Sequence, residues 1–453
     1  MPQVRDGIRG RGSRGAGADL TATVVGGGLA GCEAAWALAE RGVVVRLVEM
    51  RPVTLTPAHR TDRLAELVCS NTFKSTEVTN AHGLLKAELR RLGSLLLACA
   101  DEARVPGGAA LAVDRDVFSA CVTERVAGHP RITVVREEAT ALPVPGIVAT
   151  GPLTSDALSR AIAAAVGASS LAFYDAIAPI VAAESLGRER LFKASRYGKG
   201  AGADYWNAPM TREEYEAFLA ALTAADQHSA HEFDQVPYFE GCLPVEEMAS
   251  RGPDTLRFGP MKPVGLTDPA TGRLPWAVVQ LRQEDRAGQM WNLVGFQTRL
   301  RIGEQQKVFR MIPGLEQAEF LRYGSIHRNA YLNTPRALTP HIALRDRPTT
   351  LFAGQLTGVE GYTESLGTGL LAGLNLARML RGDEPLLPPP TTMLGALLRY
   401  LREADPAHFQ PMNANFGLLE PLAEAPRDKR RKKEQLVERA LADMDVFARA
   451  VDA

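Results

Sequence analysis

Residues 21–49 read TATVVGGGLAGCEAAWALAERGVVVRLVE, and this stretch decides the fold. A short β-branched run at 21–25 leads into the glycine-rich segment 26–31, which is followed by an alanine-rich helix at 32–40. Gly42 ends the helix, and a second apolar run at 43–48 stops at Glu49. This order of strand, glycine-rich turn, helix and strand predicts the βαβ unit of a Rossmann-type dinucleotide-binding domain.

The glycines and the acid of this unit each have a physical role in binding a dinucleotide. Gly26 permits the tight turn, Gly28 lets the backbone approach a pyrophosphate, and Gly31 permits close packing of the helix on the sheet. Glu49 follows Gly31 by 18 residues, where a carboxylate accepts hydrogen bonds from ribose hydroxyls. Because its charge would repel the 2′-phosphate of NADP, we expect FAD or NAD in this pocket.

Two later segments favour FAD. Residues 148–151 read VATG and are similar to a strand-end segment of two-domain flavoproteins. Residues 351–354 read LFAG, and GYTES follows at 361–365, where a helix N-terminus would stabilise negative charge on a reduced flavin. Gln355 stands where many such enzymes have Asp. The predicted cofactor-binding residues are Gly26, Gly27, Gly28, Leu29, Ala30, Gly31, Glu49, Gly354, Gln355, Gly361, Tyr362 and Gly369.

The composition is that of a globular protein of two or three domains. The chain has 453 residues, of which 45% are hydrophobic and 23% are charged, and 52 basic residues balance 52 acidic ones. No apolar run approaches the ~20 residues that a membrane span requires. The five cysteines are scattered without a C-x-x-C pair, which argues against a disulfide framework or a zinc site and favours the cytoplasm.

The pattern of elements predicts an α/β protein with an FAD-binding Rossmann-type domain, an inserted α+β domain and a C-terminal helical segment. Residues 1–18 are rich in Arg and Gly and are predicted to be a disordered tail. We expect a discontinuous FAD-binding domain at 19–175 and 326–453, with a substrate domain inserted at 176–325. Leucines at helical spacing predict one amphipathic helix over 83–103.

Longer strings carry a resemblance to a known family. They are ELVCSN at 66–71, YFEGCLP at 238–244, LRFGPMKPVG at 256–265, VGFQT at 294–298 and GQLTGVEGY at 354–362. With these strings the chain resembles the folate- and FAD-dependent tRNA (uracil-5-)-methyltransferases over about residues 20–440. Gly198 and Ala208 depart from the Asp and Cys that the family leads us to expect.

The resemblance implies the activity, the cofactors and the partners. It implies that the enzyme makes ribothymidine in the T-loop of tRNA, with methylenetetrahydrofolate as the one-carbon donor. It also implies that NADPH or NADH reduces FAD, which carries the carbon and supplies reducing equivalents. No metal and no membrane partner are implied. The related FAD- and folate-using enzyme that modifies wobble uridines is the alternative, but it has a longer C-terminal helical domain.

The implied chemistry needs a reactive thiol. Carbon-5 of uracil is a poor nucleophile until a thiolate adds at carbon-6, and a second group must then remove the carbon-5 proton. The resemblance places Cys69 and Cys242 near the flavin as the catalytic residues, with a slight preference for Cys242 as the nucleophile. Cys32, Cys99 and Cys121 lie in apolar helical settings and are assigned to packing.

A basic run near the C-terminus is the predicted contact for tRNA phosphates. A run of this kind is more often a solvated helix face, but the implied tRNA partner favours phosphate binding. Tyr197, Tyr205 and Trp206 are candidates to stack on an extruded base, or else form a small aromatic core. The residues of the basic run are Lys429, Arg430, Arg431, Lys432 and Lys433.

Overall fold

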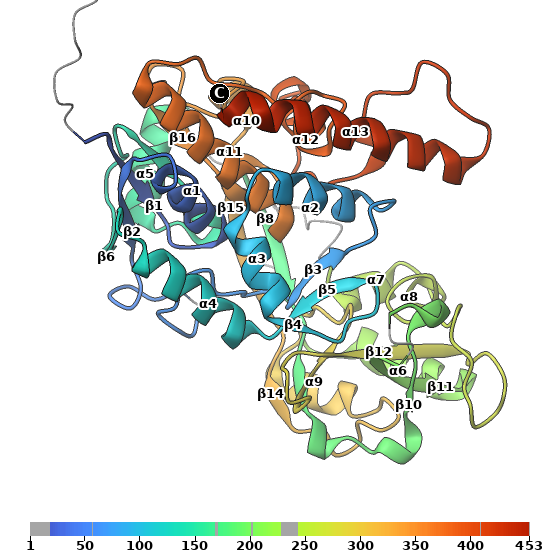
Figure 1. Ribbon diagram of the computed structural model, residues 1–453. Helices are drawn as coiled ribbons and strands as arrows, with labels where there is room; N and C mark the ends of the chain where they lie inside the picture. Colours follow the sequence, from blue (N-terminus) through green and yellow to red (C-terminus); the bar gives the residue numbers. More distant parts are fainter. Residues whose placement is uncertain are drawn as a thin grey trace, which may run out of the picture.

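A computed structural model describes residues 19–56, 58–167, 171–200, 203–227, 243–407 and 409–452. Its elements form two layered parts, with the parallel sheet and long helices on one side and an antiparallel sheet at the lower right of Figure 1. Side chains are described throughout these ranges except at 171–177, 325–330 and 452.

The first part is built on a five-stranded parallel sheet with the order β16-β7-β1-β2-β6. This sheet confirms the predicted α/β class and brings the C-terminal strand β16 beside strands from the first third of the chain. The bounds of these strands are β1 (Thr21–Val25), β2 (Val44–Glu49), β6 (Ile132–Arg136), β7 (Gly146–Val148) and β16 (Thr350–Phe352). Strands β1 and β2 lie within one residue of their predicted positions.

Two helices in this part pack against each other through small residues. They are α1 (Leu29–Ala39) and α11 (Tyr362–Arg381), which cross over the parallel sheet. A Cβ atom at Gly369 would lie 2.2 Å from the carbonyl oxygen of Ala30, and one at Gly373 would lie 2.6 Å from that of Ala34. Glycine is required at both positions because the two backbones approach so closely. The helix that follows the first nucleotide motif is thereby joined to the helix that follows the last.

The predicted single helix over 83–103 is wrong, because the chain forms two helices there. They are α2 (Ala81–Arg91) and α3 (Leu95–Glu102). Gly93 adopts a left-handed conformation with φ of +80°, and the Ser94 side chain accepts a hydrogen bond from Leu97 N as the N-cap of α3. The leucine spacing continues across this break, so periodicity alone did not show it, whereas Gly93 and Ser94 are a recognisable stop and start.

The second part is a six-stranded antiparallel sheet with the order β10-β11-β12-β13-β9-β14. Its buried side chains form a core separate from the core of the first part. This separation supports the predicted division into domains, whose bounds stay a prediction. The strands are β9 (Ile180–Ala182), β10 (Phe192–Lys193), β11 (Tyr205–Met210), β12 (Ala277–Gln283), β13 (Met290–Leu293) and β14 (Phe320–Arg322), and the helices are α6 (Arg212–Ala224), α7 (Val245–Ser250), α8 (Thr255–Phe258) and α9 (Ile302–Phe309).

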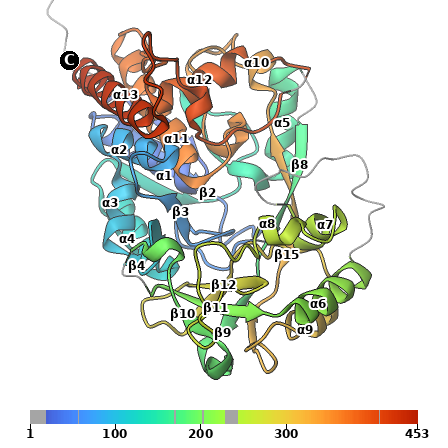
Figure 2. The same ribbon diagram turned by 90° about the vertical axis from the view of Figure 1, so that its right-hand side faces the viewer.

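The chain passes between the two parts through one antiparallel ribbon. It leaves the first part along β8 (Leu171–Ile177) and returns along β15 (Ser325–Tyr331), and the two strands pair along their whole length. The predicted bounds at 175/176 and 325/326 fall in this ribbon. A short sheet consists of β3 (Thr72–Ser75), β5 (Ala110–Val113) and β4 (Arg104–Val105). In Figure 2 its strands β3 and β4 lie on the left above the antiparallel sheet, and the ribbon lies on the right.

The C-terminal helices close the top of the first part. They are α10 (Thr334–Ala337), α12 (Met393–Glu403) and α13 (Lys429–Asp452), and the remaining helices of the first part are α4 (Arg115–Gly128) and α5 (Asp156–Val166). The buried carboxylate of Glu88 on α2 accepts hydrogen bonds from Met393 N and Leu394 N at the start of α12. Within the described ranges, no helix has the length and apolar character to cross a membrane.

Candidate active site

The glycine-rich turn after β1 forms a cradle at the C-terminal edge of the parallel sheet. A Cβ atom at Gly26 would lie 2.5 Å from the Ala149 carbonyl oxygen, and one at Gly31 would lie 1.8 Å from the Gly26 carbonyl oxygen. At Gly28, by contrast, no protein atom lies within 4 Å of the Cβ position. Gly26 and Gly31 therefore serve backbone packing, whereas Gly28 leaves space open at the N-terminus of α1. This is the arrangement that a bound pyrophosphate requires.

A pocket with about 540 Å³ of empty space opens beside this turn. Thr150, in the segment 148–151 that is similar to flavoproteins, and the later Thr154 both contribute to its wall. The fit to a nucleotide rests on the open position at Gly28 and on a carboxylate at the end of β2. The lining also includes Val25, Gly26, Gly28, Glu49, Arg51, His59 and Glu138.

Glu49 is held as an anion at the rim of this pocket. Its carboxylate accepts hydrogen bonds from Gly27 N at 2.8 Å and from Arg51 N and Nε at 3.0 and 2.9 Å. Burial alone would raise the pKa of Glu49, but the Arg51 guanidinium and these donors outweigh burial and lower it. Arg51 is itself buried and also pairs with Glu66. Glu49, the predicted acceptor for the ribose hydroxyls, is therefore ionised, and its carboxylate is held in one orientation.

The second nucleotide motif lies directly against the first. Gly354 has φ of +74°, and a Cβ atom there would lie 2.9 Å from the Ala30 Cβ. Gln355 donates a hydrogen bond to Glu360 Oε2 at 2.6 Å, which closes the loop before α11. Gly361 is the N-cap of α11 with φ of +122°. Of the residues predicted to hold a cofactor, Gly369 faces Ala30, so helix packing accounts for that glycine.

The Tyr362 hydroxyl joins this motif to the loop that carries Cys69. Its oxygen accepts hydrogen bonds from Cys69 N and Ser70 N, both at 3.0 Å. Burial first, and then the neighbouring Cys69 thiol, raises the pKa of Tyr362, so this hydroxyl stays neutral. The first turn of α11 and Cys69, which lie far apart in sequence, therefore meet at one place.

Side chains from several elements hold the Cys69 loop, 67–71. Arg115 donates hydrogen bonds to the carbonyl oxygens of Leu67 at 2.5 Å and Cys69 at 3.5 Å. From the antiparallel sheet, Arg322 donates to the Val68 carbonyl oxygen at 2.8 Å, and Arg282 donates to Ser70 Oγ at 3.2 Å. None of these arginines was predicted from the sequence, although charged residues in an otherwise apolar strand such as β12 are a signal of function.

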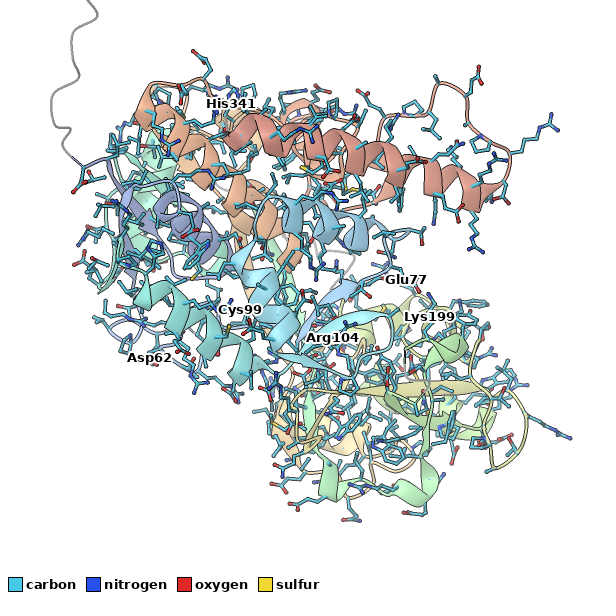
Figure 3. All side chains as sticks on the ribbon, viewed as in Figure 1. Asp62, Glu77, Cys99, Arg104, Lys199 and His341 are labelled. Carbon is cyan, nitrogen blue, oxygen red and sulfur yellow. The ribbon has the colours of Figure 1, made fainter. Side chains whose placement is uncertain are left out.

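The other predicted cysteines divide into two groups. Cys242 and residues 238–241 of its string lie outside the described residues. Cys32, Cys99 and Cys121 lie on α1, α3 and α4, and burial raises the pKa of all three thiols. Figure 3 shows Cys99 beside α4. Their positions agree with the predicted packing role.

The residues that directly follow the string 238–244 are hydrogen-bonded to the string 294–298. Val245 N at the start of α7 donates a hydrogen bond to the Gln297 carbonyl oxygen, and buried Glu246 accepts one from Thr298 Oγ1. The departure at Ala208 is a buried position of β11, and the departure at Gly198 is a left-handed residue beside Tyr197.

The three aromatic candidates for base stacking differ in their contacts and in their exposure. The Tyr205 hydroxyl is bonded to the Gly107 carbonyl oxygen, and Trp206 packs edge-on against Trp291 with Lys193 over both rings. Tyr197 alone of the three is exposed, at 62%, and it has a left-handed φ of +59°. An exposed ring on a strained backbone is the arrangement expected of a ligand contact.

The basic run forms the start of α13. All five of its residues, 429–433, are exposed. Arg430 pairs with Glu434 along the helix, and Lys433 lies over the Phe416 ring. Across the gap between the two parts, Lys199 pairs with Glu77 at 2.7 Å (Figure 3). No cluster of three or more candidate metal ligands occurs in the described ranges.

Comparisons with known proteins give a consistent picture. Residues 21–384 match the family "glucose inhibited division protein A". The chain is 59% identical to the methylenetetrahydrofolate--tRNA-(uracil-5-)-methyltransferase TrmFO of Geobacter sulfurreducens, over 93% of this chain and 98% of that one. It is 56% identical to the TrmFO of Heliobacterium modesticaldum, over 94% and 98% of the two chains.

Among solved structures, the chain is similar to GidA of Aquifex aeolicus. The TM-score is 0.69 at 15% sequence identity, over 96% of this chain and 74% of that one. Identity this low makes the likeness evidence for the fold alone.

Proposed function

We infer that this chain, which belongs to the glucose-inhibited division protein A family and within it to the methylenetetrahydrofolate--tRNA-(uracil-5-)-methyltransferases, methylates a tRNA uridine at carbon-5. The observation that carries this inference is the high identity over nearly the whole length of both chains. The proposed product is ribothymidine in the T-loop, and the proposed one-carbon donor is methylenetetrahydrofolate. We also propose that the enzyme acts in the cytoplasm, where its proposed tRNA substrate is found.

FAD is the cofactor that the residues of the pocket fit. The open position at Gly28 and the N-terminus of α1 suit its pyrophosphate, and the ionised Glu49 suits its adenosine ribose. Gly361 and Tyr362 at the start of α11 suit the flavin end, because a helix N-terminus favours negative charge. When bound, FAD would supply the one-carbon transfer and the reducing equivalents, with NADPH or NADH as the proposed reductant.

The chain's own residues present and activate the base. We propose Cys69 and Cys242 as the catalytic thiols, one adding to carbon-6 of the uracil and the other removing the carbon-5 proton. Cys69 suits either role, because its loop is held by Tyr362, Arg115 and Arg322.

The basic run 429–433 and Tyr197 are the proposed contacts for the tRNA. Exposed lysines and arginines on one helix turn suit phosphates, and the exposed Tyr197 ring suits a base lifted from the loop. Replacing Lys432 and Lys433 by Glu should weaken tRNA binding and flatten its dependence on salt. Replacing Arg131 and Arg160 by Glu is the matched control, because these exposed cations lie beside β6 and on α5, at the other end of the molecule from the start of α13 (Figure 1).

A labelled donor tests the whole proposal. The purified protein is incubated with unmodified tRNA, NADPH and methylenetetrahydrofolate labelled in its one-carbon unit, and the RNA is then digested. Label in ribothymidine, lost when the T-loop uridine is replaced, is the expected result. Label at a wobble uridine would instead favour the alternative enzyme class, and absence of label from an FAD-loaded protein would reject methyl transfer.

A further inference from the structure

The loop around Cys69 is fixed mainly by side chains that lie far away in the sequence. From the first part, Tyr362 accepts hydrogen bonds from Cys69 N and Ser70 N, and Arg115 donates to the carbonyl oxygens of Leu67 and Cys69. These contacts alone fix only one side of the loop.

The antiparallel sheet holds the other side. Arg322, the last residue of β14, donates a hydrogen bond to the Val68 carbonyl oxygen at 2.8 Å. Arg282 on β12 donates to Asn71 Oδ1 at 2.9 Å and to Ser70 Oγ at 3.2 Å. The Asn71 amide in turn donates to the Gln283 carbonyl oxygen at 2.9 Å. The reactive loop therefore spans the contact between the two parts of the molecule.

The charges at this contact are unevenly neutralised. Arg115 pairs with Glu284 at 2.7 Å, and the Glu284 side chain is only 1% exposed. Arg322 has no carboxylate within ion-pair distance among the described side chains. Burial, and then the nearby Arg115 charge, lower the pKa of Arg322 to about 10, so the guanidinium is still a cation at neutral pH. Arg322 is thus a half-buried cation without an acid partner among the described side chains, and its contact with the Val68 carbonyl oxygen indicates that it serves the Cys69 loop.

We propose that Arg322 is a positioning residue through which the antiparallel sheet holds Cys69 in its reactive state. The guanidinium fixes the peptide before Cys69 and brings a positive charge to the Cys69 loop, so Cys69 reacts fully only while the two parts are docked. This inference rests on the proposed function in taking Cys69 as a catalytic thiol. It adds that the substrate-binding part controls that thiol.

The place of Arg322 in the chain supports this coupling. Residues 323–324 follow it and lead directly into β15, one strand of the ribbon that links the two parts. A displacement of the antiparallel sheet about this ribbon would withdraw the Arg322, Arg282 and Gln283 contacts together. A tRNA that binds on the sheet is therefore able to change the reactivity of Cys69 without touching it.

The test measures the reactivity of Cys69 directly. Full-length FAD-loaded protein is treated with iodoacetamide at pH 7, and alkylation of the Cys69 peptide is followed by mass spectrometry. Arg322→Gln keeps a donor for the Val68 oxygen but removes the charge, and Arg322→Lys keeps both. Arg310→Gln is the matched control, because Arg310 donates to the Ala318 carbonyl oxygen within the same sheet part.

We expect Arg322→Gln to slow alkylation of Cys69 about tenfold, the effect of losing one charge-assisted interaction. Arg322→Lys should restore the rate to within about threefold, and Arg310→Gln should leave it unchanged. In turnover, kcat should fall with Arg322→Gln while the KM for tRNA stays constant. An alkylation rate in Arg322→Gln equal to that in Arg310→Gln, or faster than in the wild type, would overturn the proposal.

The outcomes separate this inference from the proposed function. Full methyl transfer by Cys69→Ala would remove Cys69 from the mechanism, yet the alkylation contrast would still report whether Arg322 controls the thiol. If Arg322→Gln lost FAD or unfolded early, the same alkylation would be measured on Arg282→Gln, which withdraws the other arginine contact from the antiparallel sheet to the loop. An alkylation rate in Arg282→Gln equal to that in Arg310→Gln would then overturn the control of Cys69 by the sheet.

Discussion

The nucleotide cradle and the Cys69 loop are two neighbouring sites that the chain builds in opposite ways. The cradle consists of backbone and glycine within one βαβ unit, and a single carboxylate, Glu49, completes it. The Cys69 loop has little structure of its own and is held by side chains from α4, α11, β12 and β14. The site proposed for the cofactor is thus made locally, whereas the loop that carries the proposed catalytic thiol is assembled across the fold.

The largest effect should come from the thiol itself. Cys69→Ala should lower the rate of methyl transfer about a thousandfold, within the range for a lost proton-transfer group, while FAD content stays at the wild-type level. Cys121→Ala is the control, because Cys121 lies half-exposed on α4 and should keep full activity. Activity and flavin absorbance measure the two sites separately. A parallel loss of FAD in Cys69→Ala would show that the two sites are not independent.

Two glycine substitutions in the cradle should distinguish a glycine that serves FAD binding, Gly28, from one that serves backbone packing, Gly31. Gly28→Ala meets no protein atom, so the protein should fold normally but bind FAD roughly tenfold to a hundredfold more weakly. Gly31→Ala places a methyl group 1.8 Å from the Gly26 carbonyl oxygen, so it should lower stability itself. Thermal unfolding of the apoproteins and titration with FAD distinguish the two. Equal FAD affinity in Gly28→Ala and wild type would contradict the assigned role of Gly28.

Tyr362→Phe tests the connection between the two sites. It leaves Cys69 N and Ser70 N without their acceptor, which should cost about 1–3 kcal/mol of stability and lower kcat about tenfold. FAD content should not change, because the ring remains. Tyr400→Phe loses a similar hydrogen bond, to the Gln410 carbonyl oxygen, far from Cys69 and should leave kcat unchanged. A fall in kcat of the same size in both variants would mean that stability, and not the loop, is responsible.

The smallest effect concerns the support of the cradle and depends on pH. Glu33 on α1 accepts hydrogen bonds from Leu95 N and Leu96 N, and burial raises its pKa from 4.5 to about 7. Between pH 4.5 and about 7 the folded state therefore binds more protons at Glu33 than the unfolded state. The contribution of Glu33 to stability is full below pH 4.5 and is lost as the pH rises through about 7. Glu33→Gln should remove this part of the pH dependence of the free energy of unfolding. Glu40→Gln, at an exposed position, should retain it.

Most of the first site was predictable from the sequence, because its determinants are contiguous. The turn at 26–31, the acid at Glu49 and the start of α11 all lie where local rules place them. The prediction of one helix over 83–103 was wrong because the helical spacing of apolar residues continues through Gly93 and Ser94, whereas the helical backbone ends there and begins again. The resemblance to a family identified Cys69 but not what holds it.

The sequence by itself determined the α/β class and the glycine-rich turn of the cradle, and it led to Cys69 as the proposed thiol. Only the tertiary structure decided which side chains meet that thiol. Arg115, Arg282, Arg322 and Tyr362 are spread over most of the chain, and no spacing rule relates them. They converge because the parallel sheet brings α11 beside α1, and the β8–β15 ribbon returns the antiparallel sheet onto the Cys69 loop. Hydrogen bonds to a loop depend on distances in space, and the order of residues fixes those distances only after the core has packed.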